Sequence, residues 1–186
     1  MARYINPVCR LCRRAGEKLF LKGTRCVTSK CAIAKRAYAP GDHGQGRRQK
    51  LSNYGLQLKE KQKAKWMYGV LERQFRRYFK IASKSKGVTG KVLLQLLERR
   101  LDNVVFRLGL GVSRAQSRQV VRHNFVYVNS KRVNIPSYLV EQGDIIQVEA
   151  KEKAMKKLRE NLELSRDRTV SSWLEFNPQE LKANVL

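Results

Sequence analysis

Residues 100–129, RLDNVVFRLGLGVSRAQSRQVVRHNFVYVN, decide how the second half of this chain folds. Apolar residues recur there with the i, i+3, i+4 and i+7 spacing of an amphipathic helix, at Leu101, Val104, Val105 and Leu108. Two glycines then end this helix. Ser113 begins a second helix, with Gln116 three residues later completing a capping box. The stretch therefore predicts two helices joined by a glycine-containing turn.

A small antiparallel sheet is predicted directly after these helices. Val126–Val128 and Lys131–Val133 flank the pair Asn129-Ser130, which indicates a two-residue hairpin turn. Asn-Gly is the more usual pair in such a turn, because serine at positive φ is less favourable than glycine. Residues 145–148 follow a Gly-Asp turn and form a third strand. We therefore expect residues 99–148 to be two helices followed by a sheet.

The flanking regions have a helical pattern. Residues 51–82 are expected to be helical with a break at Gly69, and residues 149–168 form a charged helix. Four large side chains in the first region recur at helical spacing and are expected in the core: Leu71, Phe75, Tyr78 and Phe79. Residues 93–97 mark a further buried helix.

All four cysteines lie in the first 31 residues. They form a Cys-x-x-Cys pair, Cys9 and Cys12, and a second pair, Cys26 and Cys31, after thirteen intervening residues. Two short-spaced pairs separated by a loop are typical of a tetrahedral metal site, and four thiolates leave no open position for a substrate. The site is therefore predicted to be structural zinc, with an iron–sulfur cluster as the open alternative.

The few apolar side chains near these cysteines support a structural role for the metal. Ordering each residue costs about 1.5 kcal/mol, and a small apolar core cannot offset that cost over some thirty residues. A structural zinc site supplies on the order of 10–16 kcal/mol. We therefore expect the metal to fold a basic loop.

The charge of the chain points to a polyanion as partner. Lys and Arg number 40 against 15 Asp and Glu, which gives a net charge of +25 and a pI near 10.5. The net charge falls along the chain, from +11 in residues 1–50 to +8 in 51–98, +5 in 99–148 and +1 in 149–186. Self-repulsion of this size favours nucleic acid as the partner, mainly for the first three segments.

Membrane association and secretion are not indicated. No basic amphipathic helix with a broad aromatic face, no lipidation motif and no stretch of roughly 20 apolar residues is found in the sequence. The first residues lack the apolar run of a signal peptide. We expect a reducing compartment, the cytoplasm or, as the alternative, the cytosol-like interior of an organelle, in which disulfides are rare.

Three arginines share one face of the second predicted helix. Arg114, Arg118 and Arg122 follow one another at i, i+4 and i+8. Like charges at this spacing repel by a few tenths of a kcal/mol per pair, about 0.2–0.5. The stripe therefore predicts a bound anion, the alternative being a solvated helix face.

The stretch from Arg100 to Val148 resembles the small RNA-binding module called the S-four domain. The resemblance is carried by three segments: residues 100–105, 111–119 and 126–129. The module also occurs in pseudouridine synthases, some synthetases and stress proteins, so by itself it leaves the function open.

The rest of the chain is similar to the bacterial family of small-subunit ribosomal protein number four, in its four-cysteine form. The motifs that carry this similarity, from residue 2 to about 176, are residues 2–4, the four cysteines, 40–44, 59–63, 68–75 and 134–138. The chain departs from the family in its Asn129-Ser130 turn. It also stops at Leu186, where the family continues by about one further strand.

The resemblance implies an α+β fold. It comprises a mostly helical domain and a small RNA-binding domain of two helices packed on a short antiparallel sheet, with a metal-stapled N-terminal segment. The implied domains are a metal-binding basic segment (1–45), a helical domain (46–97, completed by about 177–186) and the S-four domain with a trailing helix (98–176).

The resemblance also implies the function. Family members are structural constituents of the small ribosomal subunit that bind 16S-type ribosomal RNA and nucleate assembly of its 5′ domain. They contact ribosomal protein number five, contribute to the mRNA entrance and to translational accuracy, and often repress their own mRNA. No small-molecule substrate is implied.

The expected binding residues follow from the motifs and the basic clusters. For mRNA at the entrance they are Arg47, Arg48 and Lys50. For ribosomal RNA they are Arg3, Arg10, Arg13, Arg14, Lys22, Arg25, Tyr54, Lys59, Lys61, Lys63, Arg73, Arg76, Arg77, Ser113, Arg114, Arg118, Arg122, His123 and Lys131.

Two rival classes are weaker. Arg100-Leu101-Asp102 superficially matches the catalytic triplet of a pseudouridine synthase, but no glycine-rich catalytic surroundings follow it. A zinc-containing DNA regulator would place its basic helix in a major groove. RNA recognition instead uses shape, phosphates and 2′-hydroxyls of a folded target. The sequence therefore predicts a protein that binds RNA and is not an enzyme.

Overall fold

The structure is a computed structural model, and it describes residues 2–46, 50–166 and 168–186. It divides into two compact units, Met1–Arg77 and Tyr78–Leu186, which we call the N-terminal unit and the C-terminal unit. In the described part of the chain, no helix is both long enough and apolar enough to cross a bilayer.

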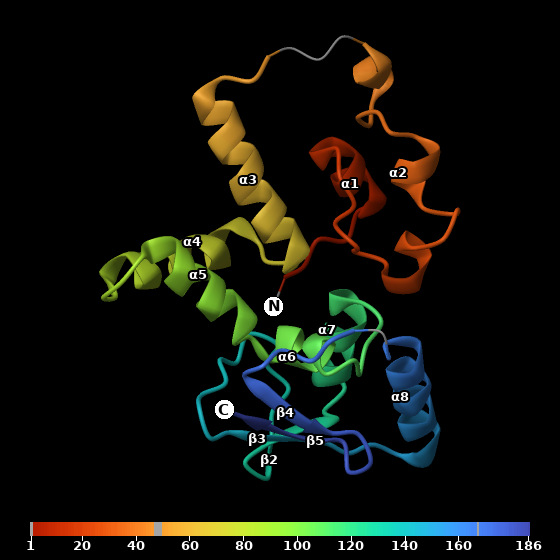
Figure 1. The fold of residues 1–186 in the computed structure, drawn as a ribbon, viewed down its shortest axis with the longest axis vertical. Coiled ribbons are helices and arrows are strands. Elements are labelled where there is room, and N and C mark those ends of the chain that lie inside the picture. The colour runs from red at the N-terminus through yellow and green to blue at the C-terminus, as the bar shows by residue number, and fades with distance from the viewer. Residues whose placement is uncertain (1, 47–49, 167) are drawn as a thin grey trace. The chain divides into compact units, whose positions relative to one another are not determined.

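The N-terminal unit is a set of helices with a small core. It contains the α-helices α1 (Cys9–Ala15), α2 (Ala32–Lys35) and α3 (Asn53–Met67), the 3-10 helices η1 (Gly23–Cys26) and η2 (Asp42–Gln45), and the start of α4 (Glu72–Lys84). Figure 1 shows α3 as a straight rod with α1 beside it. The buried residues Cys12, Ala15 and Leu19 pack against the last turn of α3. This core is small for 77 residues, because most side chains of the unit are polar.

The predicted helix break is confirmed, whereas the predicted core of α4 is partly wrong. Gly69 has a φ of +63° between α3 and α4, a conformation that glycine adopts readily. Phe75 and Tyr78 are each only 4% exposed, but Leu71 and Phe79 are 37% and 52% exposed. One residue further along a helix points about 100° away, so Phe79 lies off the buried stripe that passes through Tyr78.

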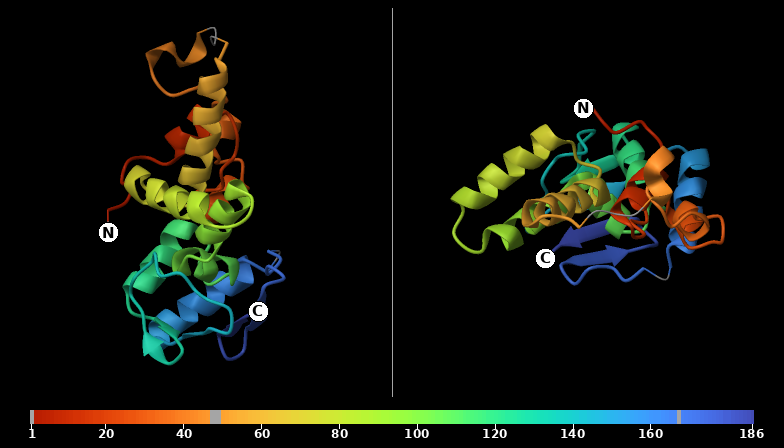
Figure 2. Two further views of the ribbon diagram at one scale, coloured as in Figure 1. Left: turned by 90° about the vertical axis from the view of Figure 1, so that its left-hand side faces the viewer. Right: turned by 90° about the horizontal axis from the view of Figure 1, so that it is seen from above.

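The C-terminal unit packs helices on a sheet. Its helices are α5 (Thr89–Glu98), α6 (Leu101–Arg107), α7 (Arg114–Arg122) and α8 (Glu152–Leu164), besides the end of α4. Its strands are β1 (Val126–Val128), β2 (Lys131–Arg132), β3 (Ile145–Val148), β4 (Leu174–Asn177) and β5 (Lys182–Val185). In the described part of this unit they form one antiparallel five-stranded sheet in the order β2-β1-β3-β5-β4 (Figures 1 and 2). The predicted α+β class is confirmed.

One continuous hydrophobic core joins α6, α7 and α8 to the sheet. The apolar face of α6 buries Val104 and Val105 completely, as the i, i+3, i+4 pattern predicts. The strands alternate, so that Val126 and Ile146 face the core while Tyr127 faces outward. Each such side chain contributes about 1.5–3 kcal/mol when fully buried. This unit therefore stabilises itself by ordinary apolar packing.

The start of α7 is capped almost as predicted. The Ser113 hydroxyl accepts a hydrogen bond from the Gln116 backbone N–H (3.3 Å), which confirms the cap. The Gln116 side-chain oxygen accepts from the Val112 N–H (2.9 Å) rather than from that of Ser113. The reciprocal bond therefore reaches one residue before the cap, and it fixes the turn that leads into α7.

The predicted hairpin between β1 and β2 is confirmed. Asn129 and Ser130 have φ values of +50° and +65°, and Val128 pairs with Lys131 across the turn. Positive φ at both central residues is the geometry of a type I′ turn, whose twist matches the strands that it joins.

The expectation that residues 177–186 complete the helical domain is wrong. Lys182–Val185 form β5, which pairs with β3 on one side and β4 on the other (Figure 1). Ala183 and Val185 alternate with polar residues and are 1% and 7% exposed. This period of two places them in the core of the sheet, which explains why the segment joins the C-terminal unit.

Candidate nucleic-acid interface

The N-terminal unit carries most of the net positive charge of the chain. Its 77 residues have a net charge of +16, against +9 for the 109 residues of the C-terminal unit. Many of the predicted RNA-binding residues of this unit are exposed, namely Arg3, Arg10, Arg14, Lys22, Arg25, Tyr54, Arg73, Arg76 and Arg77. Lys50, predicted to contact mRNA, is also exposed, whereas Arg47 and Arg48 lie outside the described residues.

Two of the three predicted lysines on α3 form ion pairs within the unit. Glu72 accepts from Lys61 (2.8 Å), Lys65 (3.0 Å) and Arg76 (3.1 Å). The hydrogen bond from Lys61, more than any other contact, lowers the pKa of Glu72 to about 2. Lys63 Nζ lies 2.7 Å from one carboxylate oxygen of Glu60 and 3.1 Å from one of Glu17. These contacts hold α3 beside α4 and beside the segment that follows α1. Lys59 is half-buried, and nothing in the described structure explains its position.

Arg13 has a structural role that the sequence did not reveal. Its guanidinium donates to the backbone carbonyls of Tyr38 (3.0 Å) and Ala39 (3.2 Å) and lies 4.8 Å from the centre of the Tyr38 ring. A cation over an aromatic face adds about 0.5–1 kcal/mol. Arg13 therefore ties α1 to the segment after α2.

The predicted arginine stripe on α7 is divided by its contacts with α6. Arg114 donates to the Asn103 side-chain oxygen (2.9 Å) and lies 4.5 Å from the centre of the Phe106 ring. Arg118 is 3.4 Å from a carboxylate oxygen of Asp102, and its side chain is only 13% exposed. Arg122 is exposed. The first two arginines therefore help to join α6 to α7, and Arg122 remains the one member of this stripe that is fully open to a partner.

A buried ion pair lies beneath this stripe. Arg100 donates to both carboxylate oxygens of Asp102 (3.0 and 2.6 Å) and to the Tyr78 hydroxyl (2.9 Å). Burial alone would lower the pKa of Arg100, but the charge of Asp102 more than offsets this and raises it. The Asp102 side chain is only 6% exposed and both of its oxygens accept hydrogen bonds from Arg100, so it lacks the access that a nucleophile on uridine needs.

The other predicted residues of the C-terminal unit differ in their exposure. Ser113 is buried at the start of α7, because its hydroxyl caps the helix. His123, directly after α7, and Lys131, on the edge strand β2, are exposed. The structure therefore leaves His123 and Lys131 accessible and gives Ser113 a structural function.

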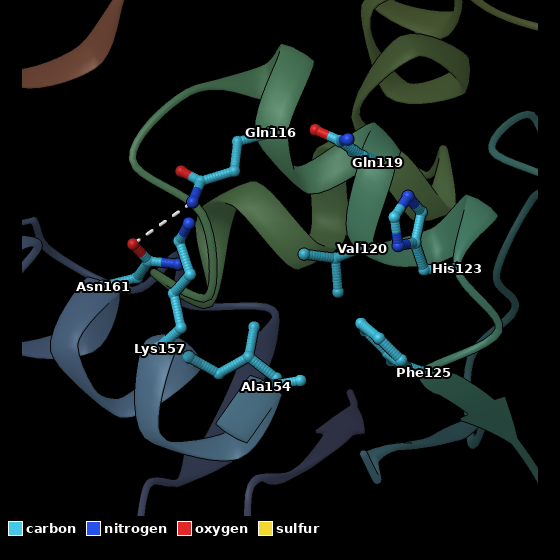
Figure 3. Close-up of a pocket in the computed structure, with 9 residues that line it drawn as sticks. Gln116, Gln119, Val120, His123, Phe125, Ala154, Lys157 and Asn161 are labelled. Carbon is cyan, nitrogen blue, oxygen red and sulfur yellow. Dashed lines mark hydrogen bonds between the residues drawn. The ribbon is translucent and has the colours of Figure 1, made fainter. Parts of the chain in front are cut away.

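Sequence reasoning missed one further feature, a small pocket between α7 and α8. It encloses about 180 Å³, and its lining includes Val120, His123, Phe125 and Lys157 (Figure 3). Residues of the predicted RNA-binding helix and of the trailing helix meet here, although about 30 residues separate them in sequence. Helical spacing shows which residues share a face of α8, but only the tertiary fold brings that face to α7.

The four cysteines are all free thiols in one basic segment. Cys12, Cys26 and Cys31 are buried and Cys9 is half-buried. Burial raises the pKa of Cys12, and the charges of the other three cysteines add to this rise. Within residues 2–46, 50–166 and 168–186, however, no three His, Cys, Asp or Glu side chains lie close enough together to hold a metal ion. The metal site therefore stays a prediction.

The sequence matches two family models that together cover residues 3–146. Residues 3–98 match the ribosomal protein S4/S9 N-terminal domain, and residues 99–146 match the S4 domain. Proteins called small ribosomal subunit protein uS4 are similar over all of this chain. Those of Acetivibrio thermocellus and Thermoanaerobacter pseudethanolicus are 59% and 56% identical, and the match covers 89% of each. That of Pelotomaculum thermopropionicum is 60% identical, and the match covers 88% of it.

Proposed function

Because this chain belongs to the uS4 family of small-subunit ribosomal proteins, we propose that it is a structural constituent of the ribosome that binds small-subunit ribosomal RNA. The family is one of structural proteins, and the chain is accordingly not an enzyme. The similarity over the whole chain is the observation that carries this proposal, because the S4 domain alone is compatible with several functions.

The distribution of charge supports ribosomal RNA as the ligand. The N-terminal unit concentrates +16 of the net charge, and its arginines on α1 and α4 are largely exposed. A folded RNA offers phosphates at many angles, which suits cations spread over several short helices better than the single groove-reading helix of a DNA regulator does. We infer that the chain binds early to the 5′ domain of 16S-type RNA and nucleates its folding.

Competition between nucleic acids tests this function. Full-length protein is titrated against a labelled 5′-domain fragment of 16S-type RNA by filter binding, with duplex DNA as competitor. We expect tight binding that weakens steeply with salt and resists duplex DNA. Equal affinity for duplex DNA would contradict the proposal.

We also propose that Cys9, Cys12, Cys26 and Cys31 hold a structural zinc ion. The chemistry of the donor set suits zinc, because the four cysteines are free thiols and thiolates are preferred ligands of this ion. When bound, the metal would cross-link the segment that carries Arg10, Arg14 and Arg25, without any open position for catalysis. Metal analysis of anaerobically purified protein tests this proposal. One zinc per chain is expected, and iron with visible absorbance would favour the cluster instead.

Three finer proposals concern the surroundings of the protein in the cytoplasm. We infer contacts with ribosomal protein number five and with mRNA at the entrance of the subunit, where Lys50 is exposed. We also infer that the chain represses translation of its own mRNA. Cross-linking of purified small subunits followed by mass spectrometry tests the first two. Cross-links from Lys50 to mRNA are expected, and their absence in subunits that hold mRNA would contradict this assignment.

A further inference from the structure

The pocket between α7 and α8 has the chemistry of a site for a nucleotide. Three side chains form its apolar floor: Val120 of α7, Leu158 of α8, and Phe125 of the segment between α7 and β1. Figure 3 shows Lys157 on one side of Val120 and the rings of His123 and Phe125 on the other. The two rings meet edge to face, with their centres 5.8 Å apart. An apolar floor between a cation and an aromatic pair suits a flat ring that carries a negative group.

The far wall of the pocket is held in place by hydrogen bonds. The Gln116 amide donates to the Asn161 side-chain oxygen (3.3 Å), as the dashed line in Figure 3 marks. Asn161 in turn donates to the Leu110 carbonyl (3.1 Å) and is only 5% exposed. These bonds fix α8 against α7, so the pocket is formed before any ligand binds. A preformed site loses little conformational freedom on binding.

The charge and size of the pocket restrict its occupant. Among the described residues that line it there is a lysine but no carboxylate, which favours an anion. Its volume of about 180 Å³ is below the roughly 300–1,000 Å³ of sites for drug-sized ligands. A single heteroaromatic ring system is therefore the largest group that it suits. The Gln119 amide at the rim offers both a donor and an acceptor to the edge of such a ring.

We propose that this pocket takes one unstacked nucleotide of the ribosomal RNA, with the base against Val120 and Phe125 and a backbone phosphate beside Lys157. RNA-binding proteins commonly recognise bases that leave the stack by packing them on aromatic side chains and contacting their edges. The proposal rests on the proposed function. It assigns to the α7–α8 junction a contact with a base, in addition to the phosphate contacts expected from exposed arginines.

Two substitutions with a matched control test this site. Ala154→Met fills the pocket from α8 without changing charge, and Lys157→Ala removes the cation at its rim. Lys156→Ala removes the same charge from an exposed neighbour outside the lining. We expect Ala154→Met to weaken binding of this chain to the 5′-domain RNA fragment by about tenfold, because the stacking contact of one base is lost. Lys157→Ala is expected to weaken it several-fold more than Lys156→Ala, with all three proteins folded by circular dichroism.

Photo-cross-linking adds a direct measurement. Wild-type protein bound to the same fragment with 4-thiouridine in place of uridine is irradiated and digested. We expect a cross-linked peptide from residues 119–125 or 154–161, which Ala154→Met removes. Wild-type protein that fails to bind the fragment would refute the proposed function itself. Normal binding by both pocket variants would instead overturn this inference alone.

Discussion

The two units of this chain use the same residue type, arginine, for opposite purposes. In the C-terminal unit, Arg100 and Arg118 meet Asp102 inside the protein, and Arg114 packs on Phe106. In the N-terminal unit, arginines such as Arg14 and Arg25 are exposed, and Glu72 is the one carboxylate among the described residues of this unit that binds more than one cation. The difference indicates that the first unit depends more on an external anion to balance its charge than the second unit does.

The two units also differ in how much apolar surface they bury. The C-terminal unit has a continuous apolar core that runs from Leu101 on α6 to Val185 on β5. In the N-terminal unit, α3 is described over all its residues and none of them is fully buried. A unit with little apolar burial and a charge of +16 is only marginally stable by itself. Ligands should therefore stabilise the N-terminal unit selectively.

Metal removal should produce the largest difference between the units. A structural zinc site contributes on the order of 10–16 kcal/mol, so chelation or Cys26→Ser should unfold residues 9–35. The apolar core of the C-terminal unit should keep α6 and β3 protected. Amide hydrogen exchange measures both regions in one sample. Exposed Ser29→Ala serves as control for the substitution, and unchanged protection of residues 9–35 after chelation would contradict the metal proposal.

The next largest effect concerns the buried ion pair of the C-terminal unit. Arg100→Leu leaves the Asp102 carboxylate buried without its main partner, which should cost about 3–5 kcal/mol in the free energy of unfolding. Exposed Arg122→Leu should cost less than about 0.5 kcal/mol. Urea denaturation followed by circular dichroism gives both values. Adding Asp102→Leu to Arg100→Leu should recover part of the loss, and equal costs for the two single variants would refute the internal role of Arg100.

A smaller, pH-dependent effect is expected at Glu72 in the N-terminal unit. Its pKa is lowered from 4.5 to about 2 in the folded chain, because Lys61, Lys65 and Arg76 bind the carboxylate. A lowered folded-state pKa stabilises the fold above the unfolded pKa, and this contribution is lost as the pH falls from 4.5 towards 2. The side chain is one-third exposed, so Glu72→Gln should cost only about 1 kcal/mol at pH 7.

Urea denaturation of wild type and Glu72→Gln at several pH values measures this effect. The difference between the two proteins should shrink steadily as the pH falls through this range. Glu180→Gln, an exposed site in the C-terminal unit, should show no comparable trend. A difference that stays constant with pH would show that Glu72 is not the carboxylate that holds α3 to α4.

The smallest effect should come from the hairpin of the C-terminal unit. Ser130 has a φ of +65°, which a side chain disfavours, so Ser130→Gly should raise the free energy of unfolding by about 0.5–1 kcal/mol. Ser130→Ala should not stabilise, because alanine keeps the Cβ. Thermal melting of the three proteins is sufficient, and a lower melting temperature for Ser130→Gly would contradict the type I′ assignment.

Local sequence patterns predicted the helices and the hairpin well, because these elements depend mainly on residues that are close together in the sequence. The spacing of Leu101 and Val104 identified α6, Ser113 marked the start of α7, and Asn129-Ser130 identified the hairpin. The resemblance of these segments to a known RNA-binding module also indicated the family. None of these inferences required knowledge of the tertiary fold.

Tertiary contacts were beyond the reach of the same patterns. Helical spacing placed Arg114 and Arg118 on one stripe, but it could not show that Asn103 and Asp102 of α6 lie against them. Lys63 is held by Glu17, 46 residues earlier. Whether a cation meets RNA or a carboxylate thus depends on which distant segment the fold brings beside it.

The salt dependence of RNA binding tests most directly whether the N-terminal unit supplies the phosphate contacts. Two triple variants are compared on the 5′-domain fragment: Arg14→Ala, Lys22→Ala and Arg25→Ala in the N-terminal unit, and Lys153→Ala, Lys156→Ala and Arg166→Ala in the C-terminal unit. Each lost phosphate contact should lower the slope of log K against log salt by about 0.7–0.9, so the first variant should lose about two units of slope. The second should keep the wild-type slope. An unchanged slope for the first variant, or an equal loss for both, would contradict the account.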